Sequence, residues 1–301
     1  MAFTAQDVKD LRERTGCGMM DCKKVLTEAD GDMEKAVELL RERGMAAASK
    51  KAGRIASEGI VYSVADLASK LGAVVEVNSE TDFVAKNESF QQFVKAVADV
   101  VIQDDPADLD ALLACKMGSE TVADELREKI LVIGENLKIR RFVRYAGTCA
   151  AYVHGGGTHA ILVQFDTTDA VAANPAFTAF GKDIAMQIAA ANPTYLDRDA
   201  VPAGDLDKER EILKAQAINE GKPEAIAEKM VAGRIGKFYE TNCLTDQKFV
   251  KDPELTIAQY IANTAKELGG DIKVLAFTRF EKGEGLEKRN DDFAAEVASM
   301  V

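Results

Sequence analysis

The chain has 301 residues, a formal net charge of −12 and 47% hydrophobic residues, which is enough apolar material for two or three small domains. The acidic balance argues against direct binding to a nucleic acid, because phosphate contacts need a basic face. Neither a bilayer-spanning apolar run nor a signal-peptide core is present, so we expect a cytoplasmic protein without membrane contact. The five cysteines are scattered and form no C-x-x-C pair, which favours buried thiols over disulfides or zinc.

Residues 1–54 predict a compact bundle of three short helices and a linker. Apolar residues recur at helical spacing in Thr4–Thr15, Met19–Glu28 and Asp32–Arg43. Glycines stand where these helices are expected to stop: Gly16, Gly31 and Gly44. The basic residues that close the segment are interpreted as a solvated connector: Lys50, Lys51 and Arg54.

From residue 58 onward the chain contains an internal repeat of a strand, a turn and a helix, found by aligning residues 77–93 with residues 164–180. The identical pairs are Thr81 and Thr168, Asp82 and Asp169, Val84 and Val171, Ala85 and Ala172, Asn87 and Asn174, Phe90 and Phe177, and Phe93 and Phe180. Residues 134–145 also align with residues 269–280, but at a longer spacing. The second copy is therefore predicted to contain an insertion.

The repeat predicts an α+β fold of two antiparallel half-domains with covering helices. The expected strands are 58–66, 71–78 and 138–146 in the first copy, and 147–153, 159–165 and 272–280 in the second. The expected helices are 88–102, 107–116, 119–133 and 175–191. In the insertion, two apolar stripes over residues 205–240 flank a turn at Gly221–Pro223, which is typical of a helical hairpin.

These elements suggest a division into domains. The predicted units are residues 1–54 (helical module and linker), 55–146 (first half-domain), 147–196 with 243–281 (second half-domain), 197–242 (helical hairpin) and 282–301 (a C-terminal module with a helix over 291–300). The hairpin either packs only on itself or also makes a contact with a second protein, as a homodimer or a 2:2 complex with a partner.

The Thr-Asp-x-Val-Ala frame occurs in both copies, so its simplest explanation is structural: Thr and Asp cap the following turn, and Val packs beneath. The copies differ at Phe83 and Lys86, which are Ala170 and Ala173 in the second copy. The scaffold therefore does not require an aromatic ring there. Such a ring is either a satellite of the core or a binding anchor that contributes roughly 1.5 to 3 kcal/mol on burial in a partner.

Enzymatic interpretations find little support in the chain. The two histidines, His154 and His159, lack a third ligand in a metal-binding pattern. The run His154–Gly157 imitates an oxyanion loop, but no G-x-S-x-G nucleophile elbow accompanies it, so a hairpin turn is the better interpretation. The Gly-Lys pairs lack the glycine spacing of a phosphate-binding loop. We expect no catalytic residue, no bound metal and no cofactor.

Three separated motifs point to one family. They are Arg14–Lys24 (RTGCGMMDCKK), Glu76–Lys86 (EVNSETDFVAK) and Phe280–Gly285 (FEKGEG). In order and spacing they resemble the N-terminal signature, the second signature and the C-terminal module of the elongation factor Ts family. Cys17 departs from the smaller residue expected in the first signature. The helical module is in addition similar to ubiquitin-associated (UBA) folds.

The resemblance implies a guanine-nucleotide exchange factor that binds the GTPase elongation factor Tu, lowers its affinity for GDP and Mg²⁺, and performs no covalent chemistry. The turn Thr81–Val84 is expected to enter the partner near its magnesium site, with Asp82 and Phe83 wedged between partner helices. Further partner contacts are expected from two groups of residues: Arg12, Met19, Met20 and Lys23 on the nucleotide domain, and His154 and Gly155 on the phosphate-loop side.

Alternatives remain open for several of these residues. Met19 and Met20 can instead belong to the core of the helical bundle, and His154 can merely close a hairpin. A UBA-like adaptor would need only residues 1–54 to bind its partner. A hydrolase would turn over substrate with no partner present and would lose activity when His154 is replaced.

Overall fold

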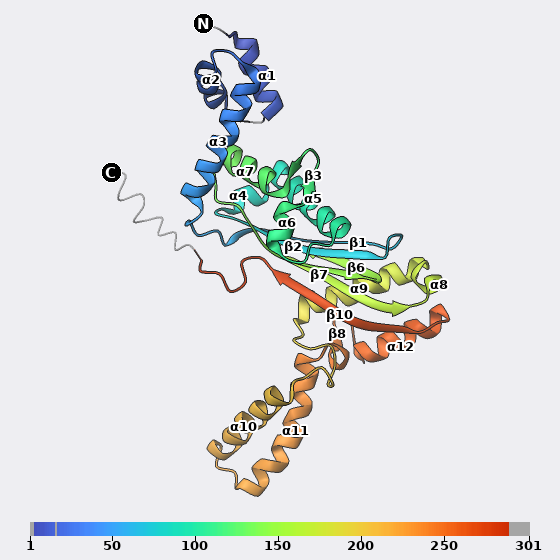
Figure 1. Ribbon diagram of the computed structural model, residues 1–301. Coiled ribbons are helices and arrows are strands. Elements are labelled where there is room, and N and C mark those ends of the chain that lie inside the picture. Colours follow the sequence, from blue (N-terminus) through green and yellow to red (C-terminus); the bar gives the residue numbers. More distant parts are fainter. Residues whose placement is uncertain (1–2, 16, 289–301) are drawn as a thin grey trace.

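The computed structural model describes residues 3–15 and 17–288, and its architecture is mixed α/β with two antiparallel three-stranded sheets (Figure 1). The first sheet has the order β1 (Glu58–Asp66), β2 (Leu71–Ser79), β5 (Lys138–Ala146). The second has the order β10 (Ile272–Glu281), β7 (His159–Thr167), β6 (Thr148–His154). The two antiparallel half-sheets predicted from the repeat are thus confirmed.

The two sheets pack face to face, and helices cover their outer faces. Helix α5 (Glu88–Asp104) lies on β1 and β2, and α9 (Pro175–Ala191) lies on β6 and β7. Because the central strands β2 and β7 are covered on both sides, they are nearly continuous apolar runs. The cluster between the sheets consists of Val61, Val74, Cys149, Ala160, Leu162 and Phe280.

The N-terminal helices are α1 (Ala5–Thr15), α2 (Met19–Glu28) and α3 (Met33–Lys51). The predicted end of the third helix at Gly44 is wrong, and Lys50 and Lys51 belong to its last turn rather than to a linker. Gly44 is buried within the helix, where an added Cβ would lie 3.5 Å from the Arg127 carbonyl oxygen of α7 (Val122–Ile133). Packing against α7 therefore sustains a helix that local glycine propensity would interrupt.

The helices and hairpins that flank the sheets differ in part from expectation. Helix α6 (Leu109–Ala114) is shorter than predicted, and α7 starts later because residues 116–121 form a small hairpin, β3 (Lys116–Met117) with β4 (Glu120–Thr121). The second copy has the matching hairpin, β8 (Lys248–Phe249) with β9 (Asp252–Thr256), followed by α12 (Ile257–Leu268). These three elements were not predicted. Short helices follow the central strands: α4 (Asp82–Ala85) and α8 (Asp169–Ala172).

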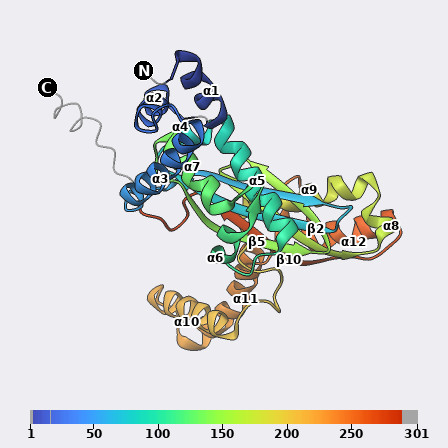
Figure 2. The same ribbon diagram turned by 45° about the horizontal axis from the view of Figure 1, so that its top comes forward.

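A helical hairpin formed by α10 (Ala203–Asn219) and α11 (Glu224–Asn242), hereafter the arm, is inserted after α9 and before η1 (Leu244–Asp246). It extends away from the sheets, on the side opposite the N-terminal helices (Figures 1 and 2). The amides of Thr194 and Tyr195 both donate to the Asn242 carbonyl, which closes the base of the arm. The insertion predicted from the repeat spacing is therefore a helical hairpin.

Two sequence predictions are not tested here. The C-terminal helix expected over residues 291–300 lies outside the described residues. The domain boundaries stay predictions, and none of them cuts a helix or strand of the described residues. Within residues 3–15 and 17–288, no helix is long and apolar enough to cross a membrane.

Candidate protein-binding site

The turn that links β2 to α5 presents one large apolar side chain to solvent. Phe83, on α4, is 76% exposed, and Asp82 beside it is exposed as well. Val84 points the other way and is buried in the core beneath α5. A ring that is held on a short helix and is mostly exposed gives the isolated protein little stability, so it is suited to burial in a partner.

Charged groups flank the exposed ring. Lys86 Nζ lies 2.9 Å from Asp82 Oδ2 and 5.6 Å from the centroid of the Phe83 ring. The hydrogen bond from Lys86 lowers the pKa of Asp82 below its ordinary value. The turn therefore offers an apolar anchor beside an ionised acid and a base, an arrangement typical of an interface hot spot with a polar rim.

A carboxylate from the loop between α7 and β5 holds the start of this turn. Glu135 Oε2 accepts hydrogen bonds from the Glu80 and Thr81 amides at 3.0 Å each, and Glu135 Oε1 accepts one from Thr81 Oγ1 at 2.5 Å. The Asn136 amide donates in return to Glu80 Oε1 at 2.6 Å. Thr81 occupies the N-cap position of α4, as predicted, but its hydroxyl donates to Glu135 and makes no cap hydrogen bond.

The predicted His154 turn lies near the same end of the sheets. His154 and Gly155 are exposed in the connection between β6 and β7. The Val61 amide donates to the Gly157 carbonyl at 3.0 Å, which ties this connection to β1. The first residue of β1 pairs with Ser79, which comes shortly before the Thr81–Val84 turn. The structure therefore places both predicted turns near one end of the two sheets.

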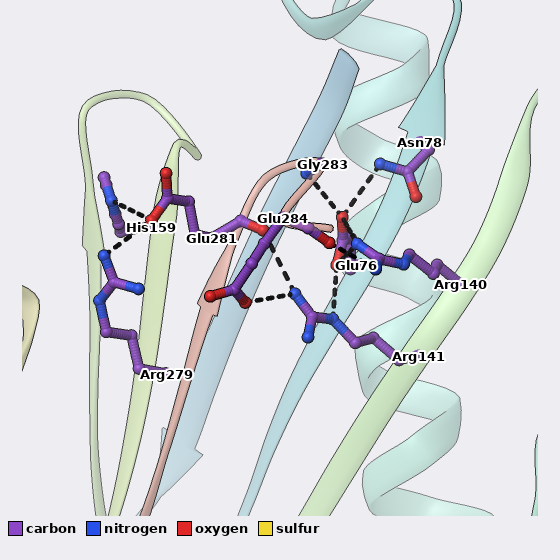
Figure 3. Close-up of polar contacts among 9 residues, drawn as sticks. All are labelled: Glu76, Asn78, Arg140, Arg141, His159, Arg279, Glu281, Gly283 and Glu284. Carbon is purple, nitrogen blue, oxygen red and sulfur yellow. Dashed lines mark hydrogen bonds and ion pairs between the residues drawn. The ribbon is translucent and has the colours of Figure 1, made fainter. Parts of the chain in front are cut away.

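A buried carboxylate anchors the segment after β10 to the same end. Glu76 on β2 has no exposed side-chain surface, and it accepts hydrogen bonds from Arg140 and Arg141 of β5 and from the Gly283 amide (Figure 3). The two arginines also donate to main-chain oxygens of residues 281 and 284. The motif containing Glu76 was recognised in the sequence, but this role was not. An acidic residue within the apolar run of β2 is the signal that indicates it.

The second histidine has a structural partner in this region. His159 Nε2 lies 3.4 Å from Glu281 Oε2, and Arg279 Nη2 donates to the same carboxylate at 2.9 Å (Figure 3). These contacts, with Arg279 as the main cause, lower the pKa of Glu281. Over the described part of the chain, no group of three His, Cys, Asp or Glu side chains is arranged to hold a metal ion.

The remaining predicted residues form a separate surface on the N-terminal helices. Met19 and Met20 are 52% and 65% exposed, so they do not belong to the bundle core. Arg12 and Lys23 are exposed too. Helices α1 and α2 pack against the N-terminal half of α3, a helix about 28 Å long (Figure 1).

Comparisons with known proteins agree on one family. The family model described as elongation factor TS matches residues 80–284. A protein of Syntrophotalea carbinolica named elongation factor Ts is 49% identical over 306 aligned residues that cover 100% of both chains. Proteins of the same name from Clostridium kluyveri and Clostridium perfringens are each 50% identical over 99% of both chains.

Proposed function

This chain belongs to the elongation factor Ts family, and from that premise we propose that it is a guanine-nucleotide exchange factor for the GTPase elongation factor Tu during translation elongation. It binds the GDP complex of that partner, weakens the hold on GDP and Mg²⁺, and lets GTP enter. The observation that carries the proposal is the exposure of Phe83. Its side chain is 76% exposed on a turn that Glu135 holds by hydrogen bonds, and the second copy has Ala170 at the same position.

The proposed exchange step is an insertion of the Thr81–Val84 turn beside the partner's magnesium site. A GTPase holds its nucleotide through a phosphate loop, a helix N-terminus and Mg²⁺, so displacing these elements together weakens every phosphate contact. Phe83 supplies the apolar wedge, and Asp82 approaches the ion. Because binding couplings are reciprocal, a factor that weakens GDP by about 4 kcal/mol, roughly a thousandfold, is itself weakened equally by GDP.

The other surfaces complete the proposed contact. The exposed side chains of the N-terminal helices lean on the nucleotide domain of the partner: Arg12, Met19, Met20 and Lys23. His154 and Gly155 touch its phosphate-loop side. The protein does this in the cytoplasm without a cofactor and without covalent chemistry of its own. The arm, with Ile212, Ile218 and Ile226 about half exposed, is the proposed surface for a homodimer or a 2:2 complex.

The first prediction concerns Phe83. Replacing Phe83 by Ala is expected to slow the release of a fluorescent GDP from elongation factor Tu roughly ten- to hundredfold relative to the wild-type factor, because the anchor loses its buried area. Stopped-flow fluorescence measures the rate. Val250→Ala serves as the matched control, because Val250 is a 47% exposed apolar residue of the β8–β9 turn. It should leave the rate unchanged.

The outcomes separate the proposal from its alternatives. A wild-type protein that does not accelerate GDP release would disprove the exchange function, and a fully active Phe83→Ala variant would limit that residue to a structural role. The exposed Met19 and Met20 favour a second candidate, a UBA-like adaptor. That candidate predicts that Met19→Ser with Met20→Ser abolishes partner binding in the full chain while Phe83→Ala has no effect.

A further inference from the structure

The two copies of the repeat treat the same threonine differently. In the second copy Thr168 is an ordinary N-cap: its hydroxyl accepts a hydrogen bond from the Val171 amide at 3.4 Å, and its φ is −76°. In the first copy Thr81 makes no such bond, its φ is −125°, and its hydroxyl donates to Glu135. Both threonines have extended backbone, but the hydroxyl of the same sequence frame has a different hydrogen-bond partner in each copy.

The carboxylate of Glu135 accounts for the difference. It accepts the Thr81 hydroxyl and the two amides of Glu80 and Thr81, and hydrogen bonds to an ionised carboxylate are about twice as strong as neutral ones. A neutral cap bond of the Thr168 type cannot compete with them. Glu135 follows Gly134, the residue that ends α7, so the helix end fixes where its side chain begins.

The second copy has no counterpart of this group. Glu135 aligns with Gly270, where an added Cβ would lie 2.7 Å from Val171 Cγ2. The neighbouring aligned positions are joined by a hydrogen bond in both copies, although the donor differs: the Asn136 amide of the loop donates to Glu80 Oε1 at 2.6 Å in the first copy, whereas the Thr167 hydroxyl of the turn donates to the Asp271 carbonyl at 2.7 Å in the second. What the first copy adds is the Glu135 carboxylate.

The Glu135 carboxylate and the Phe83 ring occur in the same copy of the repeat. The copy with the carboxylate also presents Phe83, and the copy with Gly270 has Ala170 in the place of Phe83. The hydrogen bonds from Glu80 and Thr81 to Glu135, hereafter the clamp, would bring little benefit to a turn that carries alanine. A turn that inserts an aromatic ring into a partner must hold that ring in one orientation. If the turn of the bound factor adopts the inserting conformation only a fraction of the time, the insertion step proceeds in proportion to that fraction.

We propose that Glu135 is a positioning residue for nucleotide exchange: it diverts Thr81 from capping and holds the Phe83 turn in the conformation that enters the partner. The inference rests on the proposed exchange function. Glu135 does not touch the nucleotide; it acts through Phe83. Without it, the Thr81 hydroxyl returns to the amide of Val84, as in the second copy, and Phe83 points elsewhere.

The test compares Glu135→Ala and Glu135→Gln in the full chain with the control Thr168→Ala, which removes a cap from the second copy. At saturating factor, Glu135→Ala should lower the maximal rate of GDP release from elongation factor Tu about tenfold while the half-saturating concentration changes less than about twofold, because the other partner contacts remain. Glu135→Gln should recover part of the rate, since its oxygen still accepts the amides. Thr168→Ala should lower the melting temperature but not the rate.

A double variant separates positioning from general destabilisation. In the Phe83→Ala background, Glu135→Ala should cause little further loss of rate, because both changes disable one turn. Losses that multiply in the double variant would overturn the proposal. So would a wild-type maximal rate in Glu135→Ala when Phe83→Ala is slow.

Hydrogen exchange measured on the factor alone keeps this inference distinct from the proposed function. The amides of Glu80 and Thr81 should exchange faster in Glu135→Ala than in the wild type, while the amide of Val171 stays unchanged. A wild-type factor that fails to release GDP would refute the exchange function and the role of Glu135 in it, even if these amides responded. Unchanged exchange at Glu80 and Thr81 would refute the clamp alone.

Discussion

Glu76 shows how a single residue joins distant parts of the chain. Its carboxylate is fully buried on β2, and it accepts hydrogen bonds from two arginines of β5, from the Asn78 side chain and from the Gly283 amide. A buried carboxylate costs desolvation energy, and its partners offset that cost only while all of them are in place. The strand before the Phe83 turn is thereby fastened to the segment after β10.

Replacing Glu76 by Ala should therefore lower the free energy of unfolding by about 3 kcal/mol, because the Gly283 amide and the Asn78 side chain lose a buried acceptor. Urea unfolding followed by circular dichroism measures the change. Glu284→Ala is the matched control: it removes the exposed partner of Arg141, 3.2 Å away, and should cost less than about 1 kcal/mol. Equal losses in the two variants would contradict a special role for Glu76.

Side chains differ in how far the sequence alone could place them. Phe83 was indicated because the other copy of the repeat has an alanine at that position, a comparison that needs no coordinates. The role of Glu135 was not predicted, although an alignment of the two copies pairs it with Gly270. The sequence does not indicate which turn a carboxylate in a loop contacts. Thr81 occupies the N-cap position, as Thr168 does, and only the position of Glu135 shows that its hydroxyl makes a different hydrogen bond.

Among the elements, α3 departs most from local propensity. It continues through Gly44 to Lys51, and Lys51 Nζ donates to the Ile130 carbonyl of α7 at 3.3 Å. The basic residues of its last turn also complement the negative end of the helix dipole. The contact between α3 and α7 at Gly44 fixes the N-terminal helices to the first half-domain.

Replacing Gly44 by Ala should stabilise the protein by about 0.5 to 1 kcal/mol, because alanine loses less backbone entropy in a helix. An alanine Cβ fits, since its nearest neighbour would be the Arg127 carbonyl oxygen at 3.5 Å. Thermal unfolding provides the measurement. Gly59→Ala is the contrasting control: φ there is +113° and the Cβ would lie 2.2 Å from the Val77 oxygen, so stability should fall. A loss of stability in Gly44→Ala would argue that α3 and α7 pack more tightly than described.

The six strands of the two sheets were predictable from sequence because the repeat supplied the central and returning strands twice, and the central strands are apolar on both faces. The element α12 was overlooked although Thr256 and Gln259 form a capping box, the same signal that Thr121 and Asp124 give at α7. The short hairpins before these helices have only two paired positions each, which is too few residues to show the alternation of apolar and polar side chains that indicates a strand.

At the scale of the whole molecule, the protein presents several surfaces around two packed sheets. The two packed sheets place the Phe83 turn and the His154 connection near one end. Helix α2, which begins with Met19 and Met20, packs on α3, and these N-terminal helices lie outside the two sheets (Figure 1). The arm leaves the opposite side (Figure 2). The presence of the inserted arm could be predicted from the repeat spacing. Its direction depends on main-chain contacts at its base, such as the isolated β-bridge between Tyr195 and Cys243, and no local sequence pattern indicates these contacts.

The arm should be the least stable of these parts. Its fully buried side chains are those of Ala217 and Ala227, which bury little area, whereas α9 buries Phe177, Phe180 and Ile184 against the second sheet. Local opening costs little where few apolar groups are buried. Hydrogen exchange followed by mass spectrometry should therefore show α10 and α11 exchanging at least about tenfold faster than α9. Ala217→Gly should speed exchange in the arm further and leave α9 unchanged. Protection of the arm equal to that of α9 in dilute protein would contradict the prediction, whereas protection that grows with protein concentration would indicate that the exposed isoleucines pair between two copies.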